Sequence, residues 1–134
     1  NINMSNKIDK ILAEISAGEL IDKITILEIK KNKISDENKL KEIDKELNSL
    51  NHTMNKSILE KSKILTFKDQ LKEINQKLWD IEDSKRMAEK KNDFGKEFIV
   101  LARNVYKLND DRARIKLKIN EILGSNIKEV KSHF

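Results

Sequence analysis

The chain has 134 residues, of which 37% are hydrophobic and 38% charged, and its formal net charge is +5. This length fits a single domain, and the composition suits elongated helices with wide solvated faces better than a compact globule. The lack of Cys excludes disulfides, thiolate nucleophiles and Cys-based zinc or iron–sulfur sites. No apolar run approaches the roughly 20 residues of a membrane span, so we expect no membrane insertion and a cytoplasmic location.

The positive charge comes almost entirely from Lys. Of 28 basic residues, the Arg residues are Arg86, Arg103, Arg112 and Arg114. Lys alternates with Asp and Glu at helical spacing and forms no long positive tract, which argues against specific nucleic-acid binding. Because Arg is scarce, each Arg suggests a position that needs a planar, bidentate donor.

The first confident element is a helix that begins at Ser16 and ends near Lys33. Ser16 and Glu19 form the S-x-x-E capping-box pattern, in which each side chain can satisfy an amide of the first turn. The apolar side chains of this helix surround most of its circumference, so the helix must be covered on more than one side. Residues 1–15 have apolar residues at helical spacing but are equally compatible with an extended lead-in, which we expect to be weakly ordered.

A second helix begins at Ser35-Asp36 and carries an apolar seam from Leu40 to Met54 with spacings of 3 and 4. Residues 51–57 have poor helix propensity. The segment 51–65 is therefore compatible with either a continued helix or a loop.

Thr66 and Asp69 predict the N-cap of a third helix that runs to about Lys91. The sequence Asn92-Asp93-Phe94-Gly95 then predicts a turn. A fourth helix follows this turn and ends at Gly124, a C-cap glycine.

Short connections between sequential helices predict antiparallel neighbours. We therefore expect an all-α protein without a sheet, an antiparallel bundle or long hairpin of about four helices, with one domain at 16–124 and a tail at 125–134. In the tail, Ile127, Val130 and Phe134 are available to dock. A slender monomer of this kind leaves apolar stripes exposed, so we expect a homodimer.

The third and fourth helices bring together acids and Arg that mark a candidate polar site. Arg112 falls on the apolar seam of the fourth helix, where it needs a partner. Helical spacing and antiparallel packing group it with acids on the third and first helices. The candidate residues are Glu19, Asp22, Lys23, Trp79, Asp80, Glu82, Asp83, Arg86, Arg103, Tyr106, Asn109 and Arg112.

This cluster has a structural and a functional interpretation. In the structural one, Asp80 or Asp83 neutralises Arg112 and fixes the helix register, while Trp79 anchors the core. In the functional one, the acids hold a divalent metal, with Asp80 and Asp83 as ligands, or the Arg residues hold a small anion. The two His residues lie outside the cluster. No cofactor is otherwise indicated.

Several motifs resemble a family of small, uncharacterised bacterial proteins with a domain of unknown function. They begin with S-A-G-E-L-I-D-K-I-T-I-L-E-I-K at 16–30 and L-W-D-I-E-D at 78–83, and continue with D-F-G at 93–95, L-A-R-N-V-Y at 101–106 and N-D-D-R-A at 109–113. The resemblance implies no activity. Its one functional implication is an association with cell-surface glycan synthesis, as an accessory of sugar-transfer machinery.

We therefore expect a non-enzymatic interaction or accessory module that binds a second copy or another protein. The alternative is a small metal- or anion-dependent enzyme or binding protein that uses the acid/Arg cluster. A structure separates them. Acids and Arg residues that neutralise one another with no cavity between them favour the first, and a water-filled pocket with unpaired carboxylates, or a bound ion, favours the second.

Overall fold

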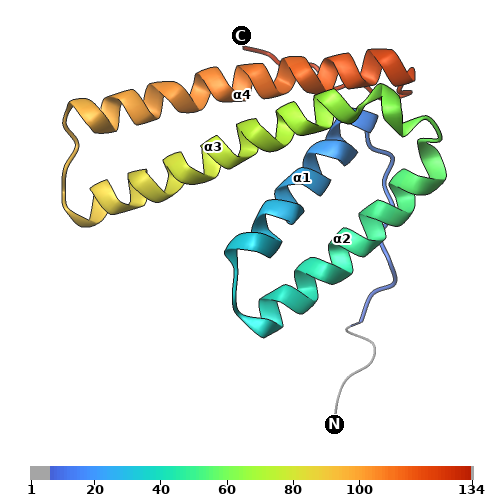
Figure 1. Ribbon diagram of the computed structural model, residues 1–134, viewed down its shortest axis with the longest axis horizontal. Helices are drawn as coiled ribbons and strands as arrows, with labels where there is room; N and C mark the ends of the chain where they lie inside the picture. The colour runs from blue at the N-terminus through green and yellow to red at the C-terminus, as the bar shows by residue number, and fades with distance from the viewer. Residues whose placement is uncertain (1–6, 134) are drawn as a thin grey trace.

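The computed structural model describes residues 7–133, which form four α-helices and one short 3₁₀ helix (Figure 1). The elements are α1 (Ala17–Lys33), α2 (Glu37–Ser57), η2 (Lys61–Lys63), α3 (Leu65–Lys90) and α4 (Lys96–Leu123). No strand occurs among the described residues, and the prediction of an all-α fold with four packed helices is confirmed.

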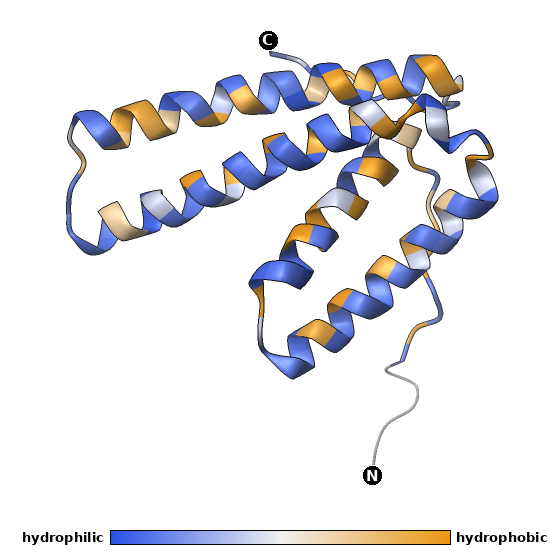
Figure 2. Cartoon of the chain, in the orientation of Figure 1, coloured by the Kyte–Doolittle hydropathy of each residue, from blue (hydrophilic) through white to orange (hydrophobic). Residues whose placement is uncertain are grey.

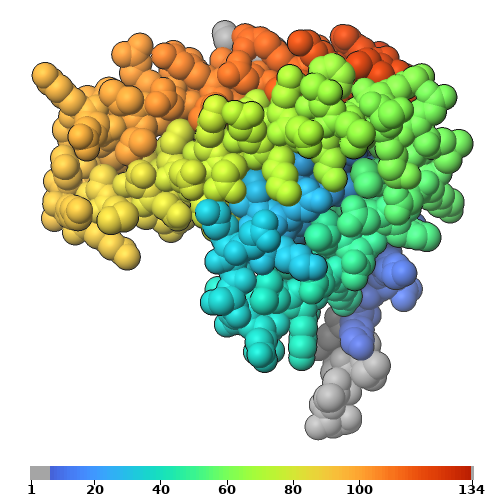
Figure 3. Space-filling model, viewed as in Figure 1, coloured from blue at the N-terminus to red at the C-terminus, as the bar shows by residue number. Residues whose placement is uncertain are grey.

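The helices form two hairpins that meet at one end of the molecule. In Figure 1, α3 and α4 lie side by side along their whole length, and the α1–α2 pair packs against one end of them. Helix α1 packs against each of the other three α-helices, whereas α2 packs mainly on α1. The far end of the α3–α4 hairpin therefore projects beyond the rest of the molecule, as the space-filling view in Figure 3 also shows.

The central position of α1 follows from its sequence. Its buried residues include Leu20, Ile21, Ile24 and Leu27, which cover much of its circumference. A helix with so wide an apolar surface is stable only when neighbours cover several sides, and this prediction is confirmed by the three helices around α1. Figure 2 shows hydrophobic residues of α1 and α2 on the sides that face each other.

The main core lies at this junction of the two hairpins. Its buried side chains come from α1, α2, the α2–α3 connection, α3 and α4, and they are Leu20, Ile21, Ile24, Leu27, Ile43, Leu47, Ile58, Ile64, Leu71 and Ile119. In contrast, none of residues 76–118, all of which the structure describes, is buried. The projecting part of the α3–α4 hairpin thus has only a half-buried seam.

The connection between α2 and α3 differs from the prediction. Helix α2 continues to Ser57 despite the poor propensity of residues 51–57, because Met54 packs against the core. Helix α3 begins at Leu65, and its N-cap residue is Ile64, which offers no side-chain hydrogen bond. The prediction of Thr66 as the N-cap is therefore wrong. Burial of Ile64 in the core, rather than a polar cap, determines where α3 begins.

The two later chain reversals follow local sequence signals. The turn between α3 and α4 contains Asn92 with φ of 53°, a left-handed conformation that Asn tolerates well. Gly124 caps α4 with φ of 63° and ψ of 44°, as predicted. Residues 7–16 form no regular secondary structure. Among residues 7–133, none of the helices combines the length and apolar character needed to cross a bilayer.

Candidate functional site

A buried polar layer crosses the core between α1 and α3. Asp22 and Thr25 of α1 and Asn75 of α3 are all buried. The Asn75 amide donates from Nδ2 to Asp22 Oδ1 at 2.8 Å and to Thr25 Oγ1 at 2.9 Å. The Thr25 hydroxyl in turn donates to the Asp22 carbonyl at 2.7 Å. These bonds compensate the desolvation of an otherwise costly buried carboxylate.

Arg112 of α4 extends this layer to the third helix of the junction. Its Nη1 donates to Asn75 Oδ1 at 3.0 Å, and its Nη2 donates to Asn109 Oδ1 at 2.8 Å. Asn75 therefore bridges Asp22 on α1 and Arg112 on α4. The Asn75 amide can do this because it offers donors on one side and an acceptor on the other.

The half-buried Arg112 guanidinium has no carboxylate within 4.0 Å among the described residues. Its two hydrogen-bond acceptors are neutral amide oxygens. The prediction that Asp80 or Asp83 neutralises Arg112 is therefore wrong. Asp80 follows Asn75 by five positions, which is about 140° around a helix of 3.6 residues per turn, and it is exposed beside Asn104 and Lys107 of α4 rather than in the buried layer.

The acidic group on α3 lies on the exposed surface of the projecting hairpin. Asp80 accepts a hydrogen bond from Gln76 at 3.2 Å, and Arg86 Nε donates to Glu82 Oε1 at 3.1 Å. Asp80, Glu82, Asp83 and Arg86 are all exposed. These contacts occur within α3, and exposed pairs of this kind contribute little to stability.

Trp79, Arg103 and Tyr106 have different surroundings. Trp79 is half-buried and, with Arg112 and Asn75, lines a small cavity of about 200 Å³ whose other walls are Ile26, Ile29 and Leu78. Arg103 and Tyr106 lie exposed on the projecting part of α4. Of the three, only Trp79 lies beside the buried layer.

The acids of the predicted cluster are dispersed rather than gathered at one point. Across residues 7–133, no three Asp, Glu or His side chains come close enough together to hold a metal ion. Asp80 and Asp83, which the sequence suggested as ligands, are both exposed on α3.

Glu19 and Lys23 lie at the start of α1, next to α4. Lys116 of α4 forms an ion pair with Glu19, and Lys23 lies 3.9 Å from the same carboxylate. Ser16 caps α1 as predicted, because its Oγ accepts from the Glu19 amide at 3.0 Å. The Glu19 side chain contacts Lys116 and thereby links α1 to α4. The sequence had predicted that Glu19 would instead complete a capping box within α1.

The remaining amides of the first turn of α1 are capped by residues from the other end of the chain. The Gly18 amide donates to Asn120 Oδ1 at 2.6 Å, and the Ala17 amide donates to Ser125 Oγ at 3.0 Å. Gly18 allows this close approach, because a Cβ at this position would lie 2.5 Å from the Lys116 carbonyl oxygen. No sequence pattern indicates these roles for Gly18, Asn120 and Ser125, because the capping groups come from a segment distant in the sequence.

The C-terminal tail completes this region by lying along α4. The Ser16 hydroxyl donates to Glu129, whose carboxylate also lies 4.0 Å from Lys116 Nζ. Lys131 Nζ lies 3.5 Å from Asp110. These polar contacts dock the tail, whereas Val130, expected to dock through apolar contact, is 92% exposed. Phe134 lies outside the described residues.

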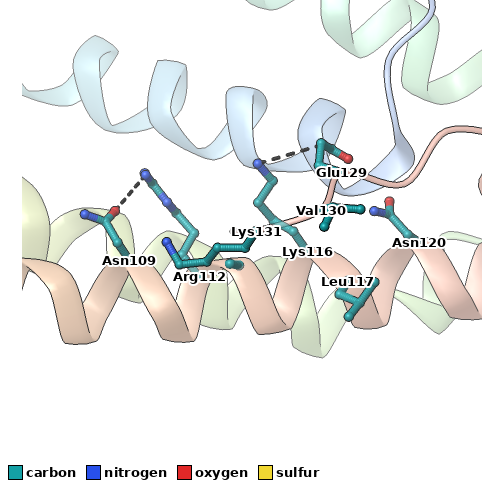
Figure 4. A pocket seen from close by; sticks show the side chains of 9 residues that line it. Asn109, Arg112, Lys116, Leu117, Asn120, Glu129, Val130 and Lys131 are labelled. Carbon is teal, nitrogen blue, oxygen red and sulfur yellow. Dashed lines mark hydrogen bonds and ion pairs between the residues drawn. The ribbon is translucent and has the colours of Figure 1, made fainter. Parts of the chain in front are cut away.

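A pocket of about 390 Å³ lies between the tail and α4 (Figure 4). It is lined by Asn109, Arg112, Ala113, Lys116, Leu117, Asn120, Glu129, Val130 and Lys131. The pocket meets the buried polar layer at Arg112. The structure therefore brings together Glu19, Asp22, Asn109 and Arg112 of the predicted cluster and leaves its α3 acids outside.

Neither the curated proteins nor the solved structures include a match to this chain. The model of a family of unknown function, DUF6165, matches residues 11–133. This match covers nearly the whole chain and confirms the resemblance drawn from the sequence motifs. The chain belongs to the DUF6165 family.

Proposed function

We propose that this protein is a non-enzymatic helical interaction module and that its projecting α3–α4 hairpin binds a second copy of the chain. One observation carries the proposal. Residues 76–118 contain no buried side chain, although large apolar residues recur along both helices. A hairpin of two helices without a buried core gains stability when another surface covers its apolar side chains.

Several exposed apolar residues of α3, α4 and the turn between them belong to this hairpin. Five large side chains are each between 48% and 55% exposed, and they are Met87, Phe94, Ile99, Val100 and Tyr106. Phe94 and Phe98 also pack edge to face, with ring centroids 5.2 Å apart. Aromatic residues and Met are enriched in the centres of protein interfaces.

The charge distribution favours a second copy as the partner. Residues 82–97 contain five acidic and five basic side chains, so this stretch is neutral although the whole chain carries +5. Two identical neutral surfaces can approach each other without the repulsion that the rest of the chain would cause. A two-fold interface also needs a self-complementary surface, which a mixture of both charges provides.

In a more specific form of this proposal, the protein is an accessory of cell-surface sugar-transfer enzymes. This more specific form rests on the family resemblance alone. The alternative function is a metal- or anion-dependent site. Its metal-binding form is weakened because Asp80 and Asp83 are exposed on α3, outside the buried layer. Its anion-binding form keeps one supporting observation, which is that no carboxylate of residues 7–133 lies within 4.0 Å of the Arg112 guanidinium.

Light scattering on the full chain at micromolar concentration tests the dimer. We expect twice the monomer mass of 15.7 kDa. Ile99→Glu should give the monomer mass, because it places a charge among the exposed apolar side chains of the hairpin. Leu59→Glu is the matched control, since Leu59 is 83% exposed in the α2–η2 connection, and it should remain dimeric. A monomeric wild-type chain, or equal effects of the two variants, would refute the proposal.

A further inference from the structure

The pocket between α4 and the tail presents positive groups from several directions. Arg112 and Lys116 extend from α4, while Glu129 and Lys131 come from the tail (Figure 4). Three of the four ionisable side chains that line it are cations. Its volume of about 390 Å³ is in the range of small-molecule sites, roughly 300–1,000 Å³.

Within the part of the chain that the structure describes, Arg112 is the cation of this pocket that has no carboxylate partner. Lys116 pairs with Glu19 and Glu129, and Lys131 pairs with Asp110. Arg112 instead donates to two amide oxygens, which fix the plane of the guanidinium without neutralising it. Two of its five N–H groups are used in these bonds, so three donors remain. A guanidinium held in a fixed plane is well suited to bidentate binding of an oxyanion.

Asn120 supplies a second donor whose direction is determined by the fold. Its side chain is 1% exposed, and its Oδ1 must accept the hydrogen bond from the Gly18 amide. Its Nδ2 therefore points away from α1, and Figure 4 shows the nitrogen on the pocket side. Among the described residues this nitrogen has no hydrogen-bond partner. An amide nitrogen that reaches the pocket without a protein acceptor can donate to a ligand there.

Glu129 shows that the pocket already accommodates a carboxylate. The tail places this side chain at one end, where the Ser16 hydroxyl and Lys116 hold it. The apolar wall formed by Ala113, Leu117 and Val130 leaves room for the body of a small molecule.

We infer that this pocket binds a small molecule through an oxyanion group, carboxylate or phosphate, which contacts Arg112 and the Nδ2 of Asn120. Arg112 supplies the charge and the planar pair of donors, and Asn120 supplies an oriented neutral donor. The pocket lining contains none of the exposed apolar side chains assigned to the dimer surface, so anion binding and dimerisation can succeed or fail independently.

Titrations of the full chain with inorganic phosphate and with acetate, at constant ionic strength maintained with chloride, test this inference. The side-chain N–H signals of Arg112 and Asn120 are followed by nuclear magnetic resonance. We expect saturable shifts at millimolar concentration with at least one probe, the affinity that a ligand of about five non-hydrogen atoms can reach. The probe that binds more tightly identifies the preferred oxyanion. Shifts that rise linearly with both probes, or that follow exposed Lys residues instead, would overturn the inference.

Variants locate the binding to the pocket. Arg112→Gln should weaken binding at least about tenfold, the loss expected for a charged hydrogen bond, whereas Arg103→Gln, on an exposed part of the same helix, should leave it unchanged. Because Arg112 also bonds to Asn75, Val130→Glu provides a test that leaves the core intact. This exposed side chain lines the pocket, and a carboxylate there should repel the ligand and weaken binding several-fold. Equal affinity of wild type and Val130→Glu would overturn the inference.

Discussion

Gly18 lies where the first turn of α1 meets the backbone of α4, and Gly18→Ala tests how much this contact stabilises the fold. The new Cβ would lie 2.5 Å from the Lys116 carbonyl oxygen and 3.0 Å from Asn120 Oδ1. The carbonyl belongs to the backbone of α4, so it cannot turn aside as the end of a side chain would. The helices must separate, which lengthens the 2.6 Å hydrogen bond from the Gly18 amide to Asn120.

The expected loss follows from three contributions. Overpacking in a close contact costs about 1–3 kcal/mol, and an unsatisfied buried amide costs about 1–3 kcal/mol. Against these, Ala in place of Gly favours a helix by about 1 kcal/mol. We therefore expect Gly18→Ala to lower the free energy of unfolding by about 3 kcal/mol, within limits of about 1–5 kcal/mol, and the melting temperature by roughly 10 °C.

Urea denaturation followed by Trp79 fluorescence and circular dichroism measures this loss. Gly95→Ala is the control, because a Cβ at Gly95 meets only an Asp93 side-chain oxygen at 3.4 Å, and it should cost no more than about 1 kcal/mol, the preference for Gly over Ala at the N-cap of α4. If Gly18→Ala is as stable as the wild type or more stable, helix propensity outweighs the contact and the argument from close packing is refuted.

Two further substitutions test the buried layer and the end of α4. Asn75→Leu should lower the free energy of unfolding by about 3 kcal/mol in urea, because it leaves Asp22 and Arg112 without their shared partner. Gln76→Leu, on the exposed side of the layer, should cost less than about 0.5 kcal/mol, and an equal loss would contradict the role of Asn75. Gly124→Ala should cost about 1 kcal/mol by the same measurement, since the residue has φ of 63° with open space around it. An unchanged stability would show that α4 can end without a left-handed residue.

Local signals in the sequence were sufficient for the elements themselves. The Ser16 N-cap, the apolar periodicity of four helices and the Gly124 C-cap each involve residues within one or two turns of one another. Such signals depend on backbone hydrogen bonds that the same segment completes, so they can be read without knowing the fold. The Ile64 start of α3 was missed because a buried side chain, rather than a polar cap, determines it.

Only the tertiary structure decided which polar residues meet. The sequence marked Arg112 as a cation on an apolar seam, but Asn75 and Asn109 became its partners, and Asp80 turned to solvent. The Asn120 and Ser125 caps of α1 arise in the same way. A contact between helices depends on how each helix is rotated about its axis, and a difference of one residue turns a side chain by about 100°. That rotation is determined by the packing of the whole core. The positions of the four helices could therefore be predicted from the sequence, whereas the residues of the buried polar layer could not.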